Sequence, residues 1–370
     1  MSRIREIELY LVELPLVRPF RVSFGTSTGK QCVLARVRTD DAEGWGECVA
    51  DDSYPGFSGE WNEGVWILLR DVLGPVLLGA ADVGIDTVEE RLRFVRGNPM
   101  AKATLIDAVV DAELRASGTS LAAYLEVDKP AVACGVSIGI ADSTDELRDQ
   151  VAEHLEQGYR RIKLKIMPGT DVERVAAIRA DHPDILLSVD ANAAYTLGDL
   201  AVFRALDVHD LLMVEQPLHH EDLVQHAALQ AEISTAICLD ESIRSAADAT
   251  AAIELGACRI VNIKQGRVGG VLEARRVHDA AAVADVPVWC GGMLETGIGR
   301  ATNLALAGMP NFRLPGDTSA SSRYFHDDLT EPFILEPDGT MLIPTGPGIG
   351  VEPRPDRLEA CTRRRELLRG

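Results

Sequence analysis

Between about residue 130 and residue 320, short apolar segments alternate with segments of helical periodicity, and this alternation constrains the fold most strongly. Near-continuous apolar strands separated by helices are typical of a parallel sheet covered by helices. Eight such strands fit a closed (β/α)8-type barrel better than an open doubly wound sheet, because no glycine-rich phosphate-binding turn follows the first strand. The expected strands are AVACGVSIG, RIKLKI, ILLSVDAN, LLMVEQP, TAICLDES, CRIVNIK, VPVWCGGM and NFRLPGD.

The segments on either side of this region have a different pattern. Residues 1–125 combine antiparallel strand patterns such as REIELYLVEL with helical ones, which predicts an α+β unit. No helix immediately follows the last barrel strand, and we expect residues 321–370 to return to the N-terminal unit. The predicted organisation is an α+β unit over 1–125, a barrel over 126–320 and a returning C-terminal segment over 321–370.

Charged residues stand near the ends of five successive expected strands, and their spacing is regular. Intervals of 25, 25, 25 and 24 residues separate Lys165, Asp190, Glu215, Asp240 and Lys264. One strand–helix unit has this length, so each residue is expected at nearly the same place on its strand. In a barrel that place is the C-terminal mouth, where catalytic groups collect.

Three of these residues are carboxylates on neighbouring strands: Asp190, Glu215 and Asp240. At close range they repel one another unless a cation neutralises them, and an all-oxygen ligand set suits Mg²⁺ best and Mn²⁺ next. No histidine or cysteine stands among them, which argues against zinc. Lys165 and Lys264 flank the carboxylates, so we expect them to approach a metal-bound substrate from opposite faces.

The strand RIKLKI places a second lysine beside Lys165. Ile162, Leu164 and Ile166 alternate with the basic residues, so Lys163 and Lys165 point to the same side. Like-charge repulsion from Lys163 is expected to lower the pKa of Lys165 from ~10.4 toward the ~7–8 that suits an acid/base group at neutral pH. Lys163 is also expected to stabilise negative charge that develops on the substrate.

A divalent metal between two opposed lysines suits removal of a proton alpha to a carboxylate. The metal neutralises the enediolate, and the lysines add or remove protons on either face. Each residue alone has a simpler explanation: a strand-terminal aspartate often caps a helix, paired lysines often mark a solvated edge, and a lone lysine often extends its charge to water. Five charges of the right types at one repeat interval favour the catalytic interpretation.

The amino-acid composition limits which binding partners and which cellular compartment we expect for this protein. The 37 basic and 57 acidic residues give a net charge of −20, which argues against nucleic acid or an anionic membrane as a partner. Seven cysteines occur without a CxxC pair, mostly in apolar runs, which suits a reducing compartment. Neither a signal peptide nor a membrane-length apolar run is visible. We therefore expect a soluble, cytoplasmic enzyme acting on a small molecule.

The amino-acid sequences of these segments are similar to those of a known family. KLK, VDAN, VEQP, LDES and NIK, in this order, resemble the muconate-lactonizing subgroup of the enolase superfamily. The longer segments DANAAYTLGD, ICLDESI, IVNIKQGRVGG, PVWCGGMLETGIGRA and LPGDTSAS resemble its N-acylamino acid racemase / o-succinylbenzoate synthase family, and PLVRPFRVSFGT and GWGEC match the N-terminal part. The resemblance implies a modified (β/α)7β TIM-type barrel with an α+β capping domain built from both chain termini.

The same resemblance implies roles for individual residues. It places Mg²⁺ on the three carboxylates and makes Lys165 and Lys264 the acid/base pair. It places Asn192 near the substrate carboxylate and implies a symmetric homo-oligomer, often an octamer. The pocket for the acyl or succinyl arm is expected to include Ser137, Met293 and two phenylalanines of a capping-domain loop, Phe20 and Phe24.

Two reactions fit one such site. An o-succinylbenzoate synthase carries out a syn dehydration on the way to menaquinone, in which Lys165 would remove the alpha proton and then protonate the departing hydroxyl. An N-succinylamino acid racemase would use Lys165 and Lys264 on opposite faces. Both reactions share the enediolate, so one site can perform both. We link Arg267 to racemisation, because a cation near Lys264 could tune that lysine into a competent base.

Other activities agree less well with the sequence. A mandelate-racemase-like enzyme would use a histidine at strand seven, which here ends WCGGMLE, and a dipeptide epimerase would show an Asp-x-Asp pair where GDTSAS supplies only Asp317. A cycloisomerase fits the GRVGG and DTSAS segments less well. A Schiff-base aldolase would leave the three carboxylates without a purpose. An inactive scaffold barrel would have no reason to keep a buried lysine pair.

Overall fold

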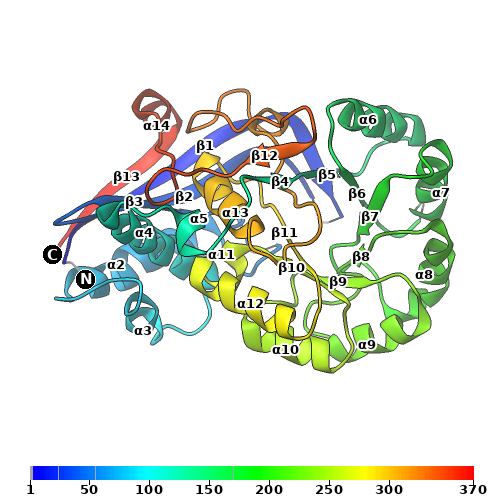
Figure 1. The fold of residues 1–370 in the computed structure, drawn as a ribbon, viewed down its shortest axis with the longest axis horizontal. Coiled ribbons are helices and arrows are strands. Elements are labelled where there is room, and N and C mark those ends of the chain that lie inside the picture. Colours follow the sequence, from blue (N-terminus) through cyan, green and yellow to red (C-terminus); the bar gives the residue numbers. More distant parts are fainter. Residues whose placement is uncertain (1–2, 24, 55, 170) are drawn as a thin grey trace.

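The computed structural model describes residues 3–23, 25–54, 56–169 and 171–370. Two main sheets organise these residues, an antiparallel sheet of four strands and a parallel sheet of seven, and a small third sheet has two strands. Figure 1 shows the parallel strands with an arc of helices around them, next to the blue strands of the antiparallel sheet. The chain therefore divides into a barrel and a second, mixed α/β part.

The antiparallel sheet is built from both ends of the chain. Strand β1 (Ile4–Val22) pairs with β2 (Gly25–Thr39) on one side and with β13 (Thr362–Arg369) on the other, and β2 also pairs with β3 (Glu43–Cys48). In Figure 1 the red C-terminal strand lies along the blue N-terminal one. The expected capping domain formed from both termini is confirmed.

Helix α4 (Pro99–Ser117) lies directly against β3. Gly46 permits this close approach, because a Cβ there would lie 2.0 Å from the carbonyl oxygen of Thr104 in the helix. The helix ends at Gly118, whose φ of 71° is the left-handed conformation favoured after a helix C-terminus. The other helical segments of this part are α1 (Asn62–Leu68), a π-helical turn (Leu69–Leu73), α2 (Gly74–Leu78), α3 (Val88–Leu92) and α5 (Leu121–Tyr124).

The parallel sheet curls into most of a barrel, in which each strand is hydrogen-bonded to the next one along the chain. Its strands are β5 (Gly135–Ile138), β6 (Arg161–Lys165), β7 (Leu186–Asp190), β8 (Val214–Glu215), β9 (Ile237–Leu239), β10 (Ile260–Ile263) and β11 (Val288–Cys290). The helices between and after them are α6 (Thr144–Glu156), α7 (Asp171–Asp181), α8 (Leu200–Leu206), α9 (Leu223–Glu232), α10 (Ala246–Glu254), α11 (Gln265–Val268), α12 (Val271–Val283) and α13 (Gly297–Ala307). Short 3-10 turns occupy Leu197–Asp199, Asp207–His209 and Ser321–Arg323.

The expected eighth barrel strand, NFRLPGD, is not a regular strand. This segment closes the barrel through isolated bridges instead, from Phe312 to Val288 on one side and from Gly316 to Cys134 on the other. Pro315 explains the interruption, because proline has no N–H to donate to a strand ladder. The prediction of eight regular strands was therefore wrong by one, although the eighth segment lies where a strand was expected.

After the barrel, the chain crosses back to the capping sheet. Strand β12 (Thr340–Leu342) pairs antiparallel with β4 (Ala131–Ala133), the strand that precedes the barrel. Helix α14 (Pro355–Cys361) then leads into β13. The last strand of the chain thus holds the first one in place.

Two further features bear on the sequence-based expectations. All seven cysteines are buried and carry free thiols, as expected of small hydrophobic side chains. Within the described residues, no helix combines the length and the apolar character needed to cross a membrane.

Candidate active site

The strand ends bring the five regularly spaced charged residues to one end of the barrel. Strand register pairs Lys165 with Asp190, and Asp190 with Glu215. Asp240 directly follows β9, and Lys264 follows β10 as the residue before α11. Four of these residues are buried, and the side chain of Lys165 is 10% exposed. The structure therefore assembles the five residues into one ring, which we call the carboxylate–lysine ring.

Lys165 is held by two acceptors at the end of β6. Its Nζ donates to Asp190 Oδ2 at 2.6 Å and to Asn192 Oδ1 at 2.7 Å. Asn192 is positioned by a backbone φ of 42°, a left-handed conformation that asparagine tolerates better than most residues. Its Nδ2 donates to Glu241 Oε1 at 3.0 Å. Asn192 thus fixes the direction of the Lys165 ammonium.

Lys163 is enclosed by negative charge. Its Nζ lies 2.8 Å from Glu215 Oε2, 2.8 Å from Asp317 Oδ2 and 3.4 Å from Asp190 Oδ2, and 4.7 Å from the ring centre of Trp289. Burial alone would lower the pKa of Lys163, but the three carboxylates outweigh it and raise the pKa well above its usual value. This balance of charge weakens the like-charge repulsion on which the expected effect of Lys163 on Lys165 depends.

Asp240 joins Lys264 to Arg267. Lys264 Nζ donates to Asp240 Oδ2 at 2.7 Å, and Arg267 Nη1 donates to Asp240 Oδ1. The guanidinium is held further by Nη2, which donates to the carbonyl of Asn262 at 2.7 Å, and by Nε, which donates to the carbonyl of Ile243 at 2.9 Å. Arg267 therefore reaches Lys264 through a shared carboxylate.

The donor chemistry of the three carboxylates fits a divalent cation. Asp190, Glu215 and Asp240 are fully or almost fully buried, and they offer only oxygen. Burial, followed by the negative charge of Asp190, raises the pKa of Glu215 to about 8. Burial also raises the pKa of Asp190, but the charges of Lys165 and Lys163 outweigh it and hold that pKa below its usual range. A divalent cation held by these oxygens would favour the ionised form of Glu215 and relieve the repulsion between the carboxylates.

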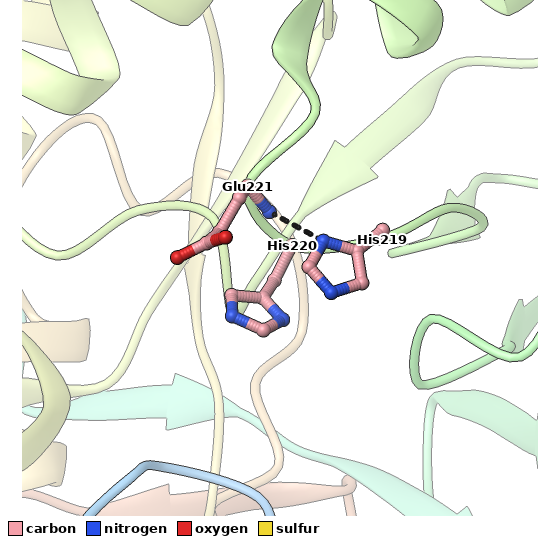
Figure 2. A group of neighbouring side chains, drawn as sticks. All are labelled: His219, His220 and Glu221. Carbon is pink, nitrogen blue, oxygen red and sulfur yellow. Dashed lines mark hydrogen bonds between the residues drawn. The ribbon is translucent and has the colours of Figure 1, made fainter.

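A second group of possible ligands lies outside the ring, in the turn after β8. Figure 2 shows His219, His220 and Glu221, whose ligand atoms lie within 4.8 Å of one another, a spacing that no other trio of such side chains reaches in the described chain. The imidazole rings stack with centroids 4.4 Å apart, and the Glu221 N–H donates to His219 Nδ1 at 3.3 Å. Two imidazoles suit a transition metal rather than Mg²⁺. Each carboxylate of the ring instead contacts a lysine, which for Glu215 is Lys163, outside the ring.

The expected pocket residues line one cavity beside the ring. A cavity of about 140 Å³ is lined by Ser137, Met293 and Phe20 together with the lysines of the ring. The Phe20 ring packs edge-to-face against Tyr324, with centroids 6.5 Å apart. The Ser137 hydroxyl is buried, and no hydrogen-bond partner for it occurs among the described residues. Phe24, the other expected pocket residue, lies outside the described residues.

Sequence reasoning missed several residues of the site. Asp317 accepts from Lys163 at 2.8 Å and from Arg161 at 2.7 Å, but it falls outside the 25-residue spacing. Glu241 is buried beside Asp240, and burial followed by the charge of Asp240 raises its pKa to about 7. It follows the end of β9, so strand alternation gives no signal for it. The GDTSAS segment, already noted in the sequence, is the one signal that could have indicated Asp317.

Family comparisons agree with this geometry. Residues 6–125 match the family described as the mandelate racemase / muconate lactonizing enzyme N-terminal domain, and residues 146–357 match the family described as enolase C-terminal domain-like. A protein of Listeria innocua described as a member of the enolase superfamily has the same fold, with a TM-score of 0.95, 37% identity and full coverage of both chains. Fold and ring together define the class: this chain is an enzyme of the enolase superfamily.

Comparison with individual relatives shows to which family within the superfamily the chain belongs. An N-succinylamino acid racemase of Amycolatopsis sp is 54% identical over 357 residues, which cover 96% of each chain. An o-succinylbenzoate synthase of Geobacillus kaustophilus is 45% identical over 358 residues, which cover 96% of this chain and 95% of the other. The chain belongs to the family that contains these o-succinylbenzoate synthases and N-succinylamino acid racemases.

Proposed function

We propose that this enzyme removes the proton alpha to a carboxylate, with Lys165 and Lys264 as acid/base groups on opposite faces of the substrate. One observation supports this most directly: carboxylates stand at the C-terminal ends of the adjacent strands β7, β8 and β9, and a lysine stands at the same end of the strand on either side, β6 and β10. A substrate bound at the carboxylates presents its alpha carbon to one lysine on each face. Positioned lysines of this kind are effective acid/base groups.

The ligands of the cation in this proposal are Asp190, Glu215 and Asp240, and the cation is Mg²⁺, with Mn²⁺ as a substitute. When bound, such a cation supplies positive charge that stabilises the enediolate of a carboxylate substrate. Asn192 orients Lys165. Lys163 adds positive charge beside the substrate, because a cation bound to Asp190 and Glu215 would offset the carboxylates that otherwise balance it. Burial of these groups excludes water, which strengthens each electrostatic interaction.

The same site supports two reactions, because both pass through the enediolate. In racemisation, one lysine takes the alpha proton from one face and the other lysine donates a proton to the opposite face. In syn dehydration, Lys165 takes the alpha proton and returns it to the departing hydroxyl, which leaves as water. We propose that the enzyme catalyses both dehydration to o-succinylbenzoate and racemisation of N-succinylamino acids, the activities for which its relatives are named.

Arg267 distinguishes the two reactions in this proposal. It contacts Asp240, which also binds Lys264. Burial would lower the pKa of Lys264, but Asp240 outweighs it and raises that pKa. By taking part of the negative charge of Asp240, Arg267 makes Lys264 easier to deprotonate. Racemisation needs Lys264 as a base, whereas dehydration needs it only as a positive charge.

The decisive experiment measures kcat/KM for two substrates with one preparation. The first is the hydroxy-cyclohexadiene precursor of o-succinylbenzoate, and the second is a set of N-succinylamino acids, each assayed with Mg²⁺ and then with chelator. We expect metal-dependent turnover of both. Racemisation without dehydration would restrict the function to the racemase, and no turnover of either would contradict the proposal. Borohydride added with substrate is expected to trap nothing, because no imine forms.

We propose further that the enzyme is a cytoplasmic homo-oligomer, an octamer, that acts on small carboxylates. The net charge of −20 supports a small-molecule substrate over a nucleic acid or an anionic membrane. Light scattering coupled to size-exclusion chromatography tests the assembly, since an octamer of 40.0 kDa chains is well separated from a dimer.

A further inference from the structure

Lys30 brings a positive charge to the cavity wall from the capping domain. It lies on β2 and lines the same cavity as Phe20 and Met293. Its side chain is only 13% exposed. Among the described residues that line this cavity, the other cations are Lys163, Lys165 and Lys264, all close to the reacting centre. Lys30 is therefore the positive charge available to a part of the substrate away from the alpha carbon.

The contacts of Lys30 hold its ammonium without fully neutralising it. Nζ donates to the carbonyl of Ala50 at 2.7 Å and to Asp52 Oδ1 at 3.1 Å. These acceptors take two of the three N–H groups that an ammonium carries. The same oxygen of Asp52 also accepts from the backbone of Gln31 at 3.3 Å and from Asn62 at 3.5 Å. Asp52 is 33% exposed, so its charge is shared and partly screened by water.

The other acid on this side of the cavity is engaged elsewhere. Asp51 Oδ2 accepts from the backbone N–H groups of Gly56 and Phe57 at 2.8 Å and of Ser58 at 3.2 Å. Its negative charge thus stabilises the 56–58 loop rather than Lys30. The neighbouring cavity walls include the apolar side chains of Val22 and Val49.

We propose that Lys30 binds the distal carboxylate of the succinyl arm and so selects succinylated substrates over neutral acyl ones. This inference rests on the proposed function, since it assigns a residue to one arm of its substrate. The methylene groups of the arm lie against Val22 and Val49, and its carboxylate accepts the third N–H of the ammonium. A neutral acyl group offers no charged acceptor to the third N–H, whereas a charged donor–acceptor pair in a largely buried site discriminates strongly.

The test compares Lys30→Met with the wild type on three substrates of one amino acid: the N-succinyl, the N-succinamoyl and the N-acetyl derivatives. The succinamoyl group has the size of the succinyl group without its charge. We expect KM for the N-succinyl substrate to rise about 10- to 100-fold, with kcat nearly unchanged and with KM for the two neutral substrates changed less than about 3-fold. Lys30→Arg is expected to restore most of the loss, because it keeps the charge.

Lys102→Met is the matched control, because Lys102 is another partly buried capping-domain lysine, which donates to a backbone carbonyl outside this cavity. It should leave the ratio of KM values unchanged. Equal losses for all three substrates in Lys30→Met would overturn the proposal and show that Lys30 only holds residues 50–52 in place. If the wild type turns over none of these substrates, binding of N-succinylglycine can be measured by calorimetry for the wild type and for Lys30→Met. Weaker binding to the variant would support the role of Lys30. Equal affinity would refute it.

Discussion

The Nζ of Lys165 lies 2.6 Å from Oδ2 of Asp190, and the two residues are register partners on neighbouring strands. The pairing of β6 with β7 therefore sets the position of the ammonium, and the side chain needs little freedom to reach its partner. A base fixed in this way loses little entropy on reaching the substrate. The proposed division of labour between the two lysines rests on such fixed positions.

Replacing either lysine of the pair is expected to impair racemisation strongly while leaving proton exchange on one face of the substrate intact. Lys165→Ala and Lys264→Ala should each reduce racemisation by ~10²–10⁴-fold, because one proton transfer is lost. Each variant should still exchange the alpha proton of the one enantiomer that faces its remaining lysine. Proton NMR of the two enantiomers in D₂O measures this exchange. If both variants exchanged the same enantiomer, the lysines would not lie on opposite faces.

Removal of the divalent metal is expected to stop turnover without unfolding the protein. Asp190→Asn should have the same effect, with kcat/KM reduced at least ~10³-fold, because one charged oxygen ligand is lost. The core of the barrel consists of apolar side chains such as Ile162 and Val189 and does not depend on an ion. Thermal unfolding followed by circular dichroism should shift by less than about 5 °C. Global unfolding on either treatment would show a structural role instead.

Arg267→Ala is expected to impair racemisation roughly 10-fold more than dehydration. The loss of the guanidinium leaves the whole charge of Asp240 on Lys264, which makes that lysine harder to deprotonate. Both kcat/KM values are measured on the same preparation, so a fall in the active fraction cancels. Equal losses in the two reactions would refute the link between Arg267 and racemisation.

A pH-dependent gain in stability is expected for Asp107→Asn, at a carboxyl that is not part of the ring. Asp107 is buried in α4 and accepts from the backbone of Val271 at 2.8 Å, and burial raises its pKa to about 7. The folded state thus holds this proton more tightly than the unfolded state, whose pKa is ~3.9. The stability from this carboxyl is complete below about pH 4 and is lost as the pH rises through 7.

Asparagine keeps an acceptor for Val271 but cannot ionise. The free energy of unfolding of Asp107→Asn relative to wild type should therefore increase between pH 5 and pH 8, by a few kcal/mol at most. Urea titrations at both pH values measure this difference. A constant difference across the range would contradict the raised pKa.

The sequence predicted the carboxylate–lysine ring well because one residue per strand–helix unit repeats at a nearly constant interval. Because neighbouring strands pair in parallel, residues separated by this interval lie at the same height in the barrel, as the pairs Lys165–Asp190 and Asp190–Glu215 show. Both the sequence pattern and the long family motifs pointed to the same fold. The capping domain was predicted from the motifs at the N-terminus and the absence of a helix immediately after the barrel.

The remaining parts of the site depend on contacts between distant segments. Asp317 contacts Lys163 from an irregular segment that contains a proline, so no periodic pattern in the sequence predicts this contact. The neutralisation of Lys163 by three carboxylates depends on which side chains meet inside the barrel. Lys30 lies on a strand of the capping domain, and nothing in its local sequence shows that it faces the cavity. Strand alternation predicts to which side of the sheet a side chain points, but it does not predict which residue that side chain contacts.

The pairing of β13 with β1 has a consequence for the order in which the protein matures. During synthesis, Phe20 and Lys30 leave the ribosome long before Thr362–Arg369, the strand that completes their sheet. The barrel segments can pair with one another as they emerge, whereas the sheet that carries the cavity wall stays incomplete until β13 has been made. A nascent chain can thus assemble its proton-transfer groups before it acquires the wall that selects among substrates.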